Sequence, residues 1–366
     1  MKPHSLDEYP VHQSPLSMAR TSTTDRNFYD RAYFNGHDRS GERFFVSGFG
    51  HYPNLGVQDA FATLREGDRQ VAVRFSDALD ERSTTTKVGA YALEVIEPLE
   101  RVRLVCEHPD LSFDITWEGS FAAVLEEQHT LMGGPRAILE ATRFAQVGTW
   151  SGTLAAFGTE HAVDPDLWLG SRDRSWGIRP VGDGDPAGRM ADEPTGGHWW
   201  TYVPLRFDDY MLMIIVQESP DGTRTLNHAT RVWRDGRVEQ LGWPRVEVDY
   251  VSGTRNPASA RIHLTTRNGA PVVVDVEPLT YVALHIGAGY GGDTDWTHGQ
   301  WMGRDWSLSS TYDLTDPEIA ARVPWGTVDF SARATCDGQE GWGMFEHMCF
   351  GRHDPSGFST WTDMAP

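Results

Sequence analysis

The segment GSRDRSWGIRP at residues 170–180 concentrates side chains that could do chemistry within an otherwise acidic chain. Read as a strand, it places Arg174 and Trp176 on one face and Asp173 and Arg179 on the other. Buried charges need partners, so the cluster is either a structural network of arginine and aspartate or part of a ligand pocket. We expect the Asp173 and Arg179 face to be structural and the Arg174 and Trp176 face to line a pocket.

A second candidate is GGHWWTYVPLRFDD at residues 196–209. Alternation places His198, Trp200 and Tyr202 on one face of this strand and plain hydrophobic residues on the other. Titratable tips on aromatic bodies are typical of a pocket wall. The alternative is a solvent-facing or hydrogen-bonded structural set.

The third candidate is the glycine-rich stretch at residues 287–306, which contains Asp295, Trp296, His298 and Trp301. A carboxyl group walled by indole rings has a raised pKa, so the stretch could form an acid/base site. A tight turn with solvated aspartates is the alternative. The glycines do not form a phosphate loop, because no GK[ST] follows them and no helix is indicated.

Motifs for metal or cofactor chemistry are absent from the sequence. It contains no HExxH and no GxSxG, and the neighbouring Glu346 and His347 would lie on opposite faces of a strand. We therefore expect neither a metal nor a cofactor.

The elements that would position these residues are strands. Apolar residues alternate with period two between Gly, Asp, Asn and Pro turns in segments such as RQVAVRFSD and ARIHLTT. Helical periodicity is scarce, and its best candidate is residues 121–144, interrupted by GGP at 133–135. The sequence predicts a mostly β protein.

Two sequence echoes suggest that the chain is duplicated. VIEPLERVRL at residues 95–104 returns as DVEPLTYVAL at 275–284, and an Asp-x-x-Trp pattern follows each copy. The stretch at 181–197, rich in Gly, Pro and Asp, is the expected linker. We predict two similar lipocalin-like β-barrel or sandwich domains in tandem, at residues 1–185 and 186–366, each large enough to hold a small apolar ligand.

Composition excludes several classes of partner. A formal net charge of −20 with no basic block argues against nucleic acid and anionic membranes. No apolar run is long enough to span a bilayer, and the beginning of the sequence lacks the pattern of a signal peptide. Three scattered cysteines are typical of buried thiols in a reducing compartment. We expect a cytoplasmic protein without stable membrane insertion.

Three segments of the sequence together resemble a known family. DRSWG at 173–177, then WTYVPLRFDD at 200–209 and the apolar return MLM at 211–213, is similar to the hydroxyneurosporene synthase (carotenoid 1,2-hydratase) superfamily, which also takes in AttH-like proteins and fungal Diels–Alderases. The resemblance implies two β domains with a hydrophobic pocket near their junction. It also implies an acid that protonates an alkene and water that captures the cation.

Carried over by position, Trp176 matches the motif tryptophan, Asp173 the motif aspartate, and Asp208 or Asp209 the acidic position. The motif histidine is Arg174 here, which stays protonated and disfavours a neighbouring carbocation. Arg174 would instead bind a substrate oxygen or polarise a carbonyl.

Two hypotheses remain open. The first is a cofactor-independent hydratase, dehydratase, isomerase or cyclase that moves a proton on a small hydrophobic, terpenoid-like substrate. The second is a non-catalytic carrier of a lipophile. The predicted catalytic residues are Arg174, His198, Asp208, Asp295 and His298. The predicted substrate-binding residues are Asp173, Trp176, Trp200, Tyr202, Trp296 and Trp301.

Overall fold

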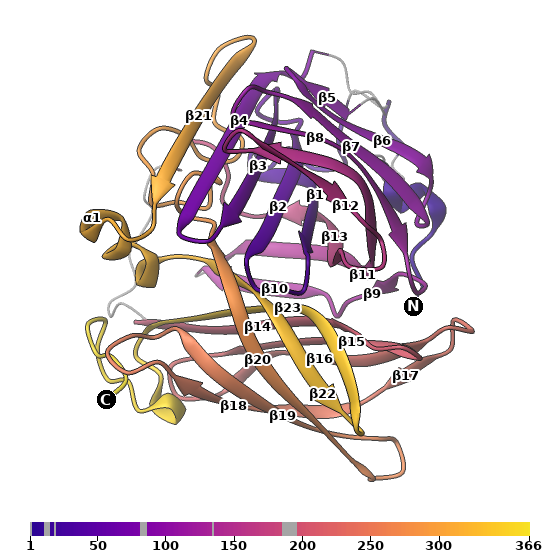
Figure 1. The fold of residues 1–366 in the computed structure, drawn as a ribbon, viewed down its shortest axis with the longest axis vertical. Coiled ribbons are helices and arrows are strands. Elements are labelled where there is room, and N and C mark those ends of the chain that lie inside the picture. Colours follow the sequence, from indigo (N-terminus) through magenta and orange to yellow (C-terminus); the bar gives the residue numbers. More distant parts are fainter. Residues whose placement is uncertain (1, 11–14, 18–19, 81–85, 134, 185–195) are drawn as a thin grey trace.

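Two curled antiparallel sheets, one above the other, make up most of the molecule (Figure 1). This computed structural model describes residues 2–10, 15–17, 20–80, 86–133, 135–184 and 196–366. The fold class is mostly β with two barrel-like sheets in tandem, so the predicted pair of lipocalin-like domains is confirmed. The predicted boundary between residues 185 and 186 lies outside the described residues.

The first sheet takes almost all of its strands from the first half of the chain. Its path is β21-β4-β3-β2-β1-β13-β11-β8-β7-β6-β5, with β9, β10 and β12 also paired to β11. The strands are β1 (Phe28–His37), β2 (Arg43–Tyr52), β3 (Val57–Glu66), β4 (Arg69–Ala78), β5 (Thr86–Val88), β6 (Tyr91–Glu97), β7 (Arg101–Glu107), β8 (Leu111–Gly119), β9 (Val124–Leu125), β10 (His129–Gly133), β11 (Arg136–Ala156), β12 (Thr159–Val163), β13 (Leu169–Ile178) and β21 (Trp306–Asp313).

The second sheet follows the order β17-β16-β15-β14-β23-β22-β20-β19-β18. Its strands are β14 (Gly197–Arg206), β15 (Tyr210–Glu218), β16 (Arg224–Trp233), β17 (Val238–Gln240), β18 (Gly242–Tyr250), β19 (Pro257–Thr265), β20 (Pro271–Ala283), β22 (Val328–Cys336) and β23 (Gln339–Gly351). The helical turns are η1 (Ser5–Glu8), α1 (Pro317–Ala320), η2 (Val323–Trp325) and η3 (Asp354–Ser356).

Burial patterns show which strands face solvent and which lie between the sheets. In β20, Val272, Val274 and Val276 are buried and alternate with exposed residues, as period two requires for a strand with one wet face. Every residue of β1 is buried, and so is nearly all of β15. Those strands are covered on both faces, because one face packs into its own barrel and the other against the other sheet.

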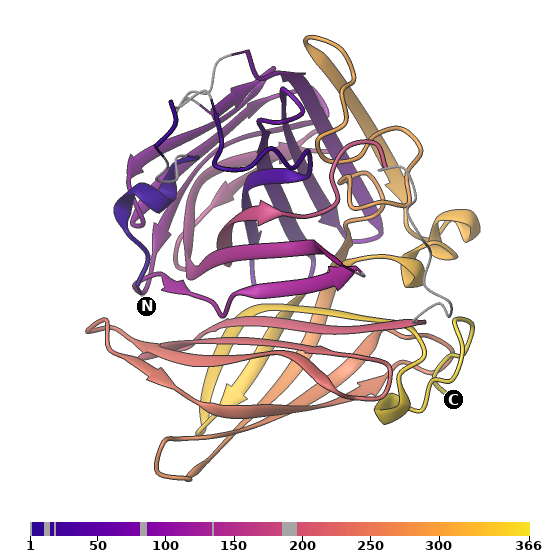
Figure 2. The ribbon, with the colours of Figure 1, turned by 180° about the vertical axis from the view of Figure 1, so that it is seen from behind.

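A separate apolar cluster forms this contact between the sheets. It combines residues of the first sheet, such as Phe44 and Val147, with residues of the second, such as Met213 and Ile215. Seen from behind, the magenta strands β10 and the start of β11 lie directly over the second sheet (Figure 2). The junction is therefore a packed apolar interface.

One helix prediction is wrong. Residues 121–144 form β9, β10 and the start of β11 instead of a helix. Gly133 ends β10 and is opposite Arg136, the first residue of β11. Pairing along β11 with five other strands overrides the weak helical periodicity.

The two sequence echoes do not occupy equivalent positions. Residues 95–104 span the turn between β6 and β7, whereas residues 275–284 run along β20. The second Asp-x-x-Trp pattern lies in the loop between β20 and β21, and the first lies in β8. These short matches therefore do not align equivalent strands of the two sheets.

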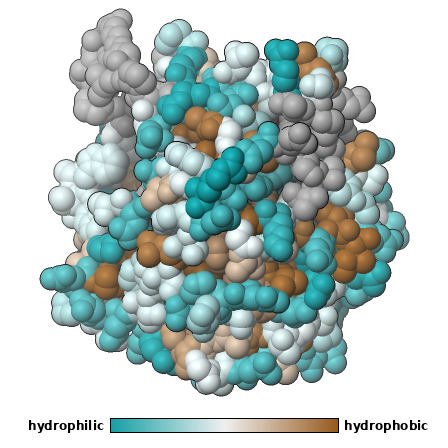
Figure 3. Space-filling model, turned by 90° about the horizontal axis from the view of Figure 1, so that it is seen from above, coloured by the Kyte–Doolittle hydropathy of each residue, from teal (hydrophilic) through white to brown (hydrophobic). Residues whose placement is uncertain are grey.

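The surface seen from above mixes hydrophilic and hydrophobic residues, with small brown patches separated by teal ones (Figure 3). In the described part of the chain, no helix is both long and apolar enough to cross a bilayer. The cytoplasmic location stays a prediction.

Candidate active site

A cavity of about 220 Å³ lies between the facing surfaces of the two sheets. The first sheet lines it with residues of β1, β11 and β13, and the second with residues of β14 and β23. Further lining comes from β10 and from the loop after β20. The lining residues are Arg31, Tyr33, His129, Leu131, Leu139, Arg143, Asp173, Ser175, Arg179, His198, Trp200, Tyr202, Tyr290, Thr327, Met344, Glu346 and Met348.

Strand register explains why polar groups of the first sheet gather here. Asp173 on β13 is directly opposite Tyr33 on β1, and Ser175 is opposite Arg31. On the other side of β13, Arg143 of β11 is also opposite Ser175. Directly opposed residues of antiparallel strands share a face, so these five side chains all point toward the second sheet.

The second sheet supplies an aromatic wall. His198, Trp200 and Tyr202 alternate along β14, and all three line the cavity. The Trp200 ring lies nearly parallel to Tyr202, with centroids 6.4 Å apart, and to His129 at 5.5 Å. Burial lowers the pKa of His129 to about 4 and also lowers that of His198, so both imidazoles are neutral at pH 7.

Asp173 is the carboxyl group of the first sheet that lines the cavity. Burial raises its pKa to about 7, against the opposing effect of the Arg143 guanidinium. The nearby Glu126 carboxylate raises the pKa further. Asp173 therefore exists in comparable amounts as an acid and as a carboxylate near neutral pH, which suits a group that exchanges a proton with a ligand.

A carboxyl pair from the second sheet completes the acidic part of the site. Asp329 of β22 is opposite Glu346 of β23, and the Tyr33 hydroxyl donates a hydrogen bond to Asp329 Oδ2. Burial raises the pKa of Asp329 well above its usual range, and the Glu346 carboxylate raises it further. Burial raises the pKa of Glu346 as well. Two interacting buried carboxyl groups share a proton. Glu346 is the member of this pair that lines the cavity.

An ion pair fixes one side of the cavity. Arg143 pairs with Glu126, whose side chain is only 1% exposed. The Tyr202 hydroxyl donates a hydrogen bond of 3.1 Å to Glu126 Oε1. The Arg143 guanidinium also lies over the Tyr202 ring, 5.1 Å from its centroid. The charge of Arg143 is thus matched within the protein, and its role is to hold Tyr202 and Glu126 in place.

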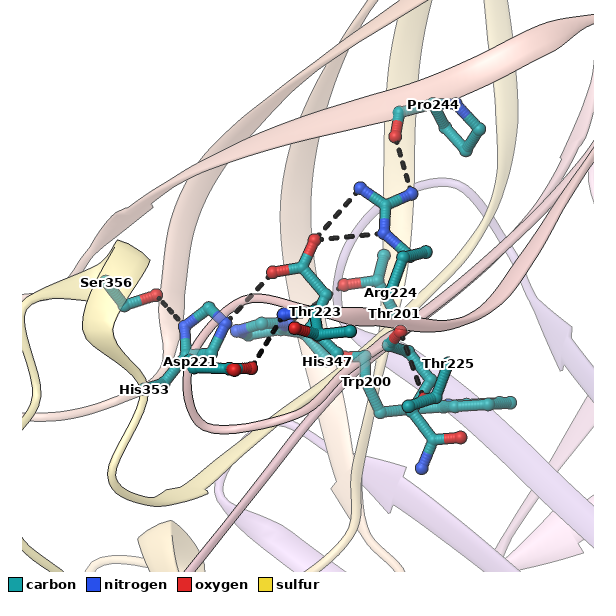
Figure 4. Close-up of polar contacts among 12 residues, drawn as sticks. Trp200, Thr201, Asp221, Thr223, Arg224, Thr225, Pro244, His347, His353 and Ser356 are labelled. Carbon is teal, nitrogen blue, oxygen red and sulfur yellow. Dashed lines mark hydrogen bonds and ion pairs between the residues drawn. The ribbon is translucent and has the colours of Figure 1, made fainter. Parts of the chain in front are cut away.

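Behind the aromatic wall, a buried histidine anchors β14. His347 Nδ1 lies 3.0 Å from the Trp200 carbonyl oxygen and 3.1 Å from Thr201 Oγ1 (Figure 4). Burial lowers the pKa of His347 to about 3, so it is neutral. The Tyr250 hydroxyl lies 3.0 Å from His347 Nε2. These contacts hold the backbone that presents Trp200 to the cavity.

The face of β13 that lines the cavity is the reverse of the one expected. Asp173, Ser175 and Arg179 line the cavity. Arg174 points the other way and forms a buried ion pair of 2.6 Å with Asp30. Trp176, two residues further along, lies on the same face as Arg174 and is opposite Asp30 in the register. The physical reason is that β13 is central in its sheet, so the charged Arg174 side is satisfied inside the first barrel.

The structure also separates most of the remaining predicted residues from the cavity. Asp208 is exposed at the turn between β14 and β15, and Asp295 is exposed in the loop after β20. Trp301 is 51% exposed, whereas Trp296 is buried in the apolar contact between the sheets. His198, Trp200, Tyr202 and Asp173 are the predicted residues that the structure brings together.

His298 lies beside the cavity instead of in it. Its Nε2 atom lies 2.8 Å from the Ala288 carbonyl oxygen, and the ring stacks on Phe61. Burial and the neighbouring Arg31 lower its pKa well below the usual range, so it stays neutral. It lines a hollow of about 580 Å³ that shares Arg179, Tyr290 and Thr327 with the cavity.

Sequence reasoning missed Tyr33, Arg143, Asp329 and the role of Glu346. Tyr33 and Arg143 lie in segments that carry no recognisable motif, and Asp329 follows a turn like many other aspartates. In the sequence, Glu346 stands out only as a candidate metal ligand beside His347. Within the described residues, no group of three or more His, Cys, Asp or Glu side chains could hold a metal ion. A signal was available in the Glu346 position, because an acidic residue in an otherwise apolar strand is costly unless partnered.

The fold and the site together define a double lipocalin-like β protein with a polar and aromatic cavity at the junction of its sheets. A model for a family of unknown function, DUF8625, matches residues 4–359. The chain belongs to this family. A search of curated proteins finds no match.

Solved structures with the same fold include three proteins with low sequence identity. A putative AttH from Nitrosomonas europaea is 14% identical with a TM-score of 0.55, and the match covers 93% of this chain and 98% of that one. Kievitone hydratase from Nectria haematococca is 15% identical with a TM-score of 0.51, covering 91% and 90%. CghA is 13% identical with a TM-score of 0.52, covering 88% of each chain.

At these identities the structural matches establish the shared fold. The resemblance to AttH-like proteins noted in the sequence is thus supported at the level of architecture. The narrower resemblance to carotenoid hydratases stays a prediction.

Proposed function

We propose that this protein is a cofactor-independent hydro-lyase or isomerase that moves a proton on a small hydrophobic, terpenoid-like molecule bound between the sheets. The observation that supports this proposal most directly is Asp173, a carboxyl group that keeps a proton near neutral pH in an aromatic-lined cavity. A protonated carboxylic acid in an aromatic-lined site is a group that can protonate an alkene or a leaving hydroxyl.

In the direction of hydration, the Asp173 proton forms a new C–H bond at one alkene carbon, and the other carbon becomes positively charged. Water then forms a C–O bond at that carbon and releases a proton to the carboxyl pair of Glu346 and Asp329. Dehydration runs these steps in reverse. Loss of a different C–H proton from the cation gives an isomer instead, so one arrangement of acid and base serves all three reactions.

Asp173 on one side and the pair of Glu346 and Asp329 on the other can serve as acid and base, because they approach the cavity from different sheets. Asp173 belongs to β13, whereas Glu346 belongs to β23 and shares its proton with Asp329. The Trp200 ring beside them can stabilise a developing positive charge by about 1–2 kcal/mol in a desolvated site. In hydration and in dehydration alike, the carboxyl group that holds its proton when the substrate binds acts as the acid, and the other acts as the base.

The size and lining of the cavity support a small apolar substrate. Its volume of about 220 Å³ exceeds the roughly 150 Å³ of an engineered apolar cavity that binds benzene. Leu131, Leu139, Met344 and Met348 supply apolar surface beside the aromatic wall. The printed name of one structural neighbour, kievitone hydratase, adds support for chemistry of this kind on the same fold.

The test is incubation with acyclic terpenes and their tertiary alcohols in deuterated water, followed by mass spectrometry of the organic extract. We expect deuterium on carbon in a product formed by the native protein. Asp173→Asn and Glu346→Gln should each lower the rate at least 100-fold. The control is Asp208→Asn, which changes an exposed aspartate remote from the cavity and should leave the rate unchanged.

Two outcomes would reject the assignment. Turnover that survives in both cavity variants would show that these carboxyl groups do not move the proton. A ligand that is retained without change, with no deuterium in any recovered compound, would favour the carrier hypothesis instead.

A further inference from the structure

One end of the cavity is cationic. Arg31 of β1 and Arg179, the residue after β13, both line it. Tyr290, from the loop after β20, also lines it. The Arg31 guanidinium lies 5.3 Å from the centroid of the Tyr290 ring. This end is also where the cavity meets the adjoining hollow, because Arg179 and Tyr290 line both.

Among the described residues, the side chain of Arg31 makes few hydrogen bonds although the residue is only 4% exposed. A guanidinium has five N–H donors. One Nη atom lies 3.2 Å from His298 Nε2, and Nε has no hydrogen-bond partner among the described residues. His298 Nε2 also lies 2.8 Å from the Ala288 carbonyl oxygen, so it cannot donate to Ala288 and accept from Arg31 at once.

Arg179 is half-buried. Its guanidinium lies over the Tyr29 ring, 5.5 Å from the centroid. Neither Arg31 nor Arg179 has a carboxylate within ion-pair distance in the part of the chain that the structure describes. Burial by itself lowers the pKa of Arg31. Electrostatic interactions with Tyr52, Tyr290 and Asp59 outweigh this effect and keep the pKa above the usual arginine range.

Two other buried arginines of the same sheet, Arg172 and Arg174, are paired with carboxylates, whereas Arg74 of β4 has a hydrogen bond to Ser310. Arg172 makes an ion pair of 2.7 Å with Glu8, and Arg174 one of 2.6 Å with Asp30. A buried charge without a directly bonded partner costs free energy, so an anion that enters the cavity and accepts hydrogen bonds from Arg31 would be bound favourably.

We propose that Arg31 and Arg179 form an oxyanion-binding subsite, and that the molecule in this cavity is a hydrophobic carboxylate. Its acid group lies at the two guanidinium groups, and its apolar chain extends along Trp200 toward Met348. Two N–H groups of one guanidinium can bind both oxygens of a carboxylate, which fixes orientation as well as affinity. The inference rests on the proposed function only for the place of binding, and it names the class of the substrate.

The test compares two ligands that share a carbon skeleton, geranate and geraniol, by isothermal titration calorimetry with the intact protein at pH 7.5. We expect geranate to bind at least tenfold more tightly than geraniol. Arg179→Gln should weaken geranate binding about tenfold and change geraniol binding by less than twofold. Arg31→Gln should act in the same direction and more strongly.

The matched control is Arg237→Gln. Arg237 also lies over an aromatic ring, that of Trp233, but it is exposed and remote from the cavity. It should leave both affinities unchanged. If Arg31→Gln fails to fold, the half-buried Arg179 still provides the comparison.

Equal affinities for geranate and geraniol would overturn the inference, as would binding of neither ligand. So would an Arg179 variant that loses both ligands equally, because this indicates a general change of the cavity. These measurements need no turnover. Selective geranate binding with no deuterium incorporation would leave the inference standing and reject the proposed chemistry, whereas turnover of neutral terpenes without carboxylate preference would do the reverse.

Discussion

Replacing Asp173 with asparagine should make the protein more stable at high pH while abolishing its proposed reaction. Asparagine has nearly the same shape as aspartate but carries no charge at any pH. In the native protein, burial raises the pKa of Asp173 from 3.8 to about 7. The folded state therefore holds this proton more tightly than the unfolded chain does, and deprotonation at higher pH works against folding.

The size of the effect follows from the two pKa values. A group that titrates near 3.8 when unfolded and near 7 when folded loses stability progressively between about pH 4 and pH 7. The full loss is about 4 kcal/mol at 1.36 kcal/mol for each pH unit. Between pH 5 and pH 8.5 it is about 3 kcal/mol. For a chain of 366 residues this corresponds to roughly 4 °C in the midpoint of thermal unfolding.

The assay is thermal unfolding of Asp173→Asn and the native protein across this pH range, followed by circular dichroism. The midpoint of the variant minus that of the native protein should rise by roughly 4 °C from pH 5 to pH 8.5. A constant offset would reflect packing, so only the change with pH reports the proton. Asp208→Asn, at an exposed turn, should show no such change. A difference that stays flat with pH would refute the raised pKa and remove the main support for Asp173 as an acid.

Three other changes test the structure. Arg174→Gln removes the ion pair with the buried Asp30 and should destabilise the protein by about 3–5 kcal/mol in urea unfolding. The ligand affinity of the folded protein should be kept. A loss of affinity at unchanged stability would place Arg174 in the site after all. Trp200→Leu removes an indole from the cavity wall and should weaken binding of an apolar ligand at least tenfold by calorimetry, and unchanged affinity would contradict that role. Gly170→Ala would bring a Cβ to 2.0 Å from the Asn35 carbonyl oxygen, so we expect a loss of at least about 3 kcal/mol, and native-like unfolding would show that β1 and β13 are less closely packed.

Local patterns were sufficient to predict the β class, because alternation reports directly on which face of a strand is buried. The valines of β20 and the row formed by His198, Trp200 and Tyr202 on β14 both follow this rule. It fails where a strand is buried on both faces, as β13 is for most of its length. There the sequence shows two faces of mixed polarity, and nothing in it says which face meets the other sheet.

Pairing between distant segments was also beyond the local pattern. β21 follows most of the second sheet in the chain, yet it pairs with β4 at the edge of the first. The loop that precedes β21 therefore passes beside the junction and brings Tyr290 and His298 next to Arg31. No period or motif in residues 284–305 indicates this route, because it is set by where the strands on either side find partners.

The sequence by itself determined the strands, their turns, the acidic surface charge and the aromatic row on β14, since each depends on residues close together in the chain. Only the tertiary structure decided which groups are chemically competent. The raised pKa of Asp173 depends on burial against the second sheet, and the pairing of Glu346 with Asp329 depends on the register of β22 and β23. Proton affinity is a property of the surroundings, and the surroundings are assembled from residues far apart in sequence.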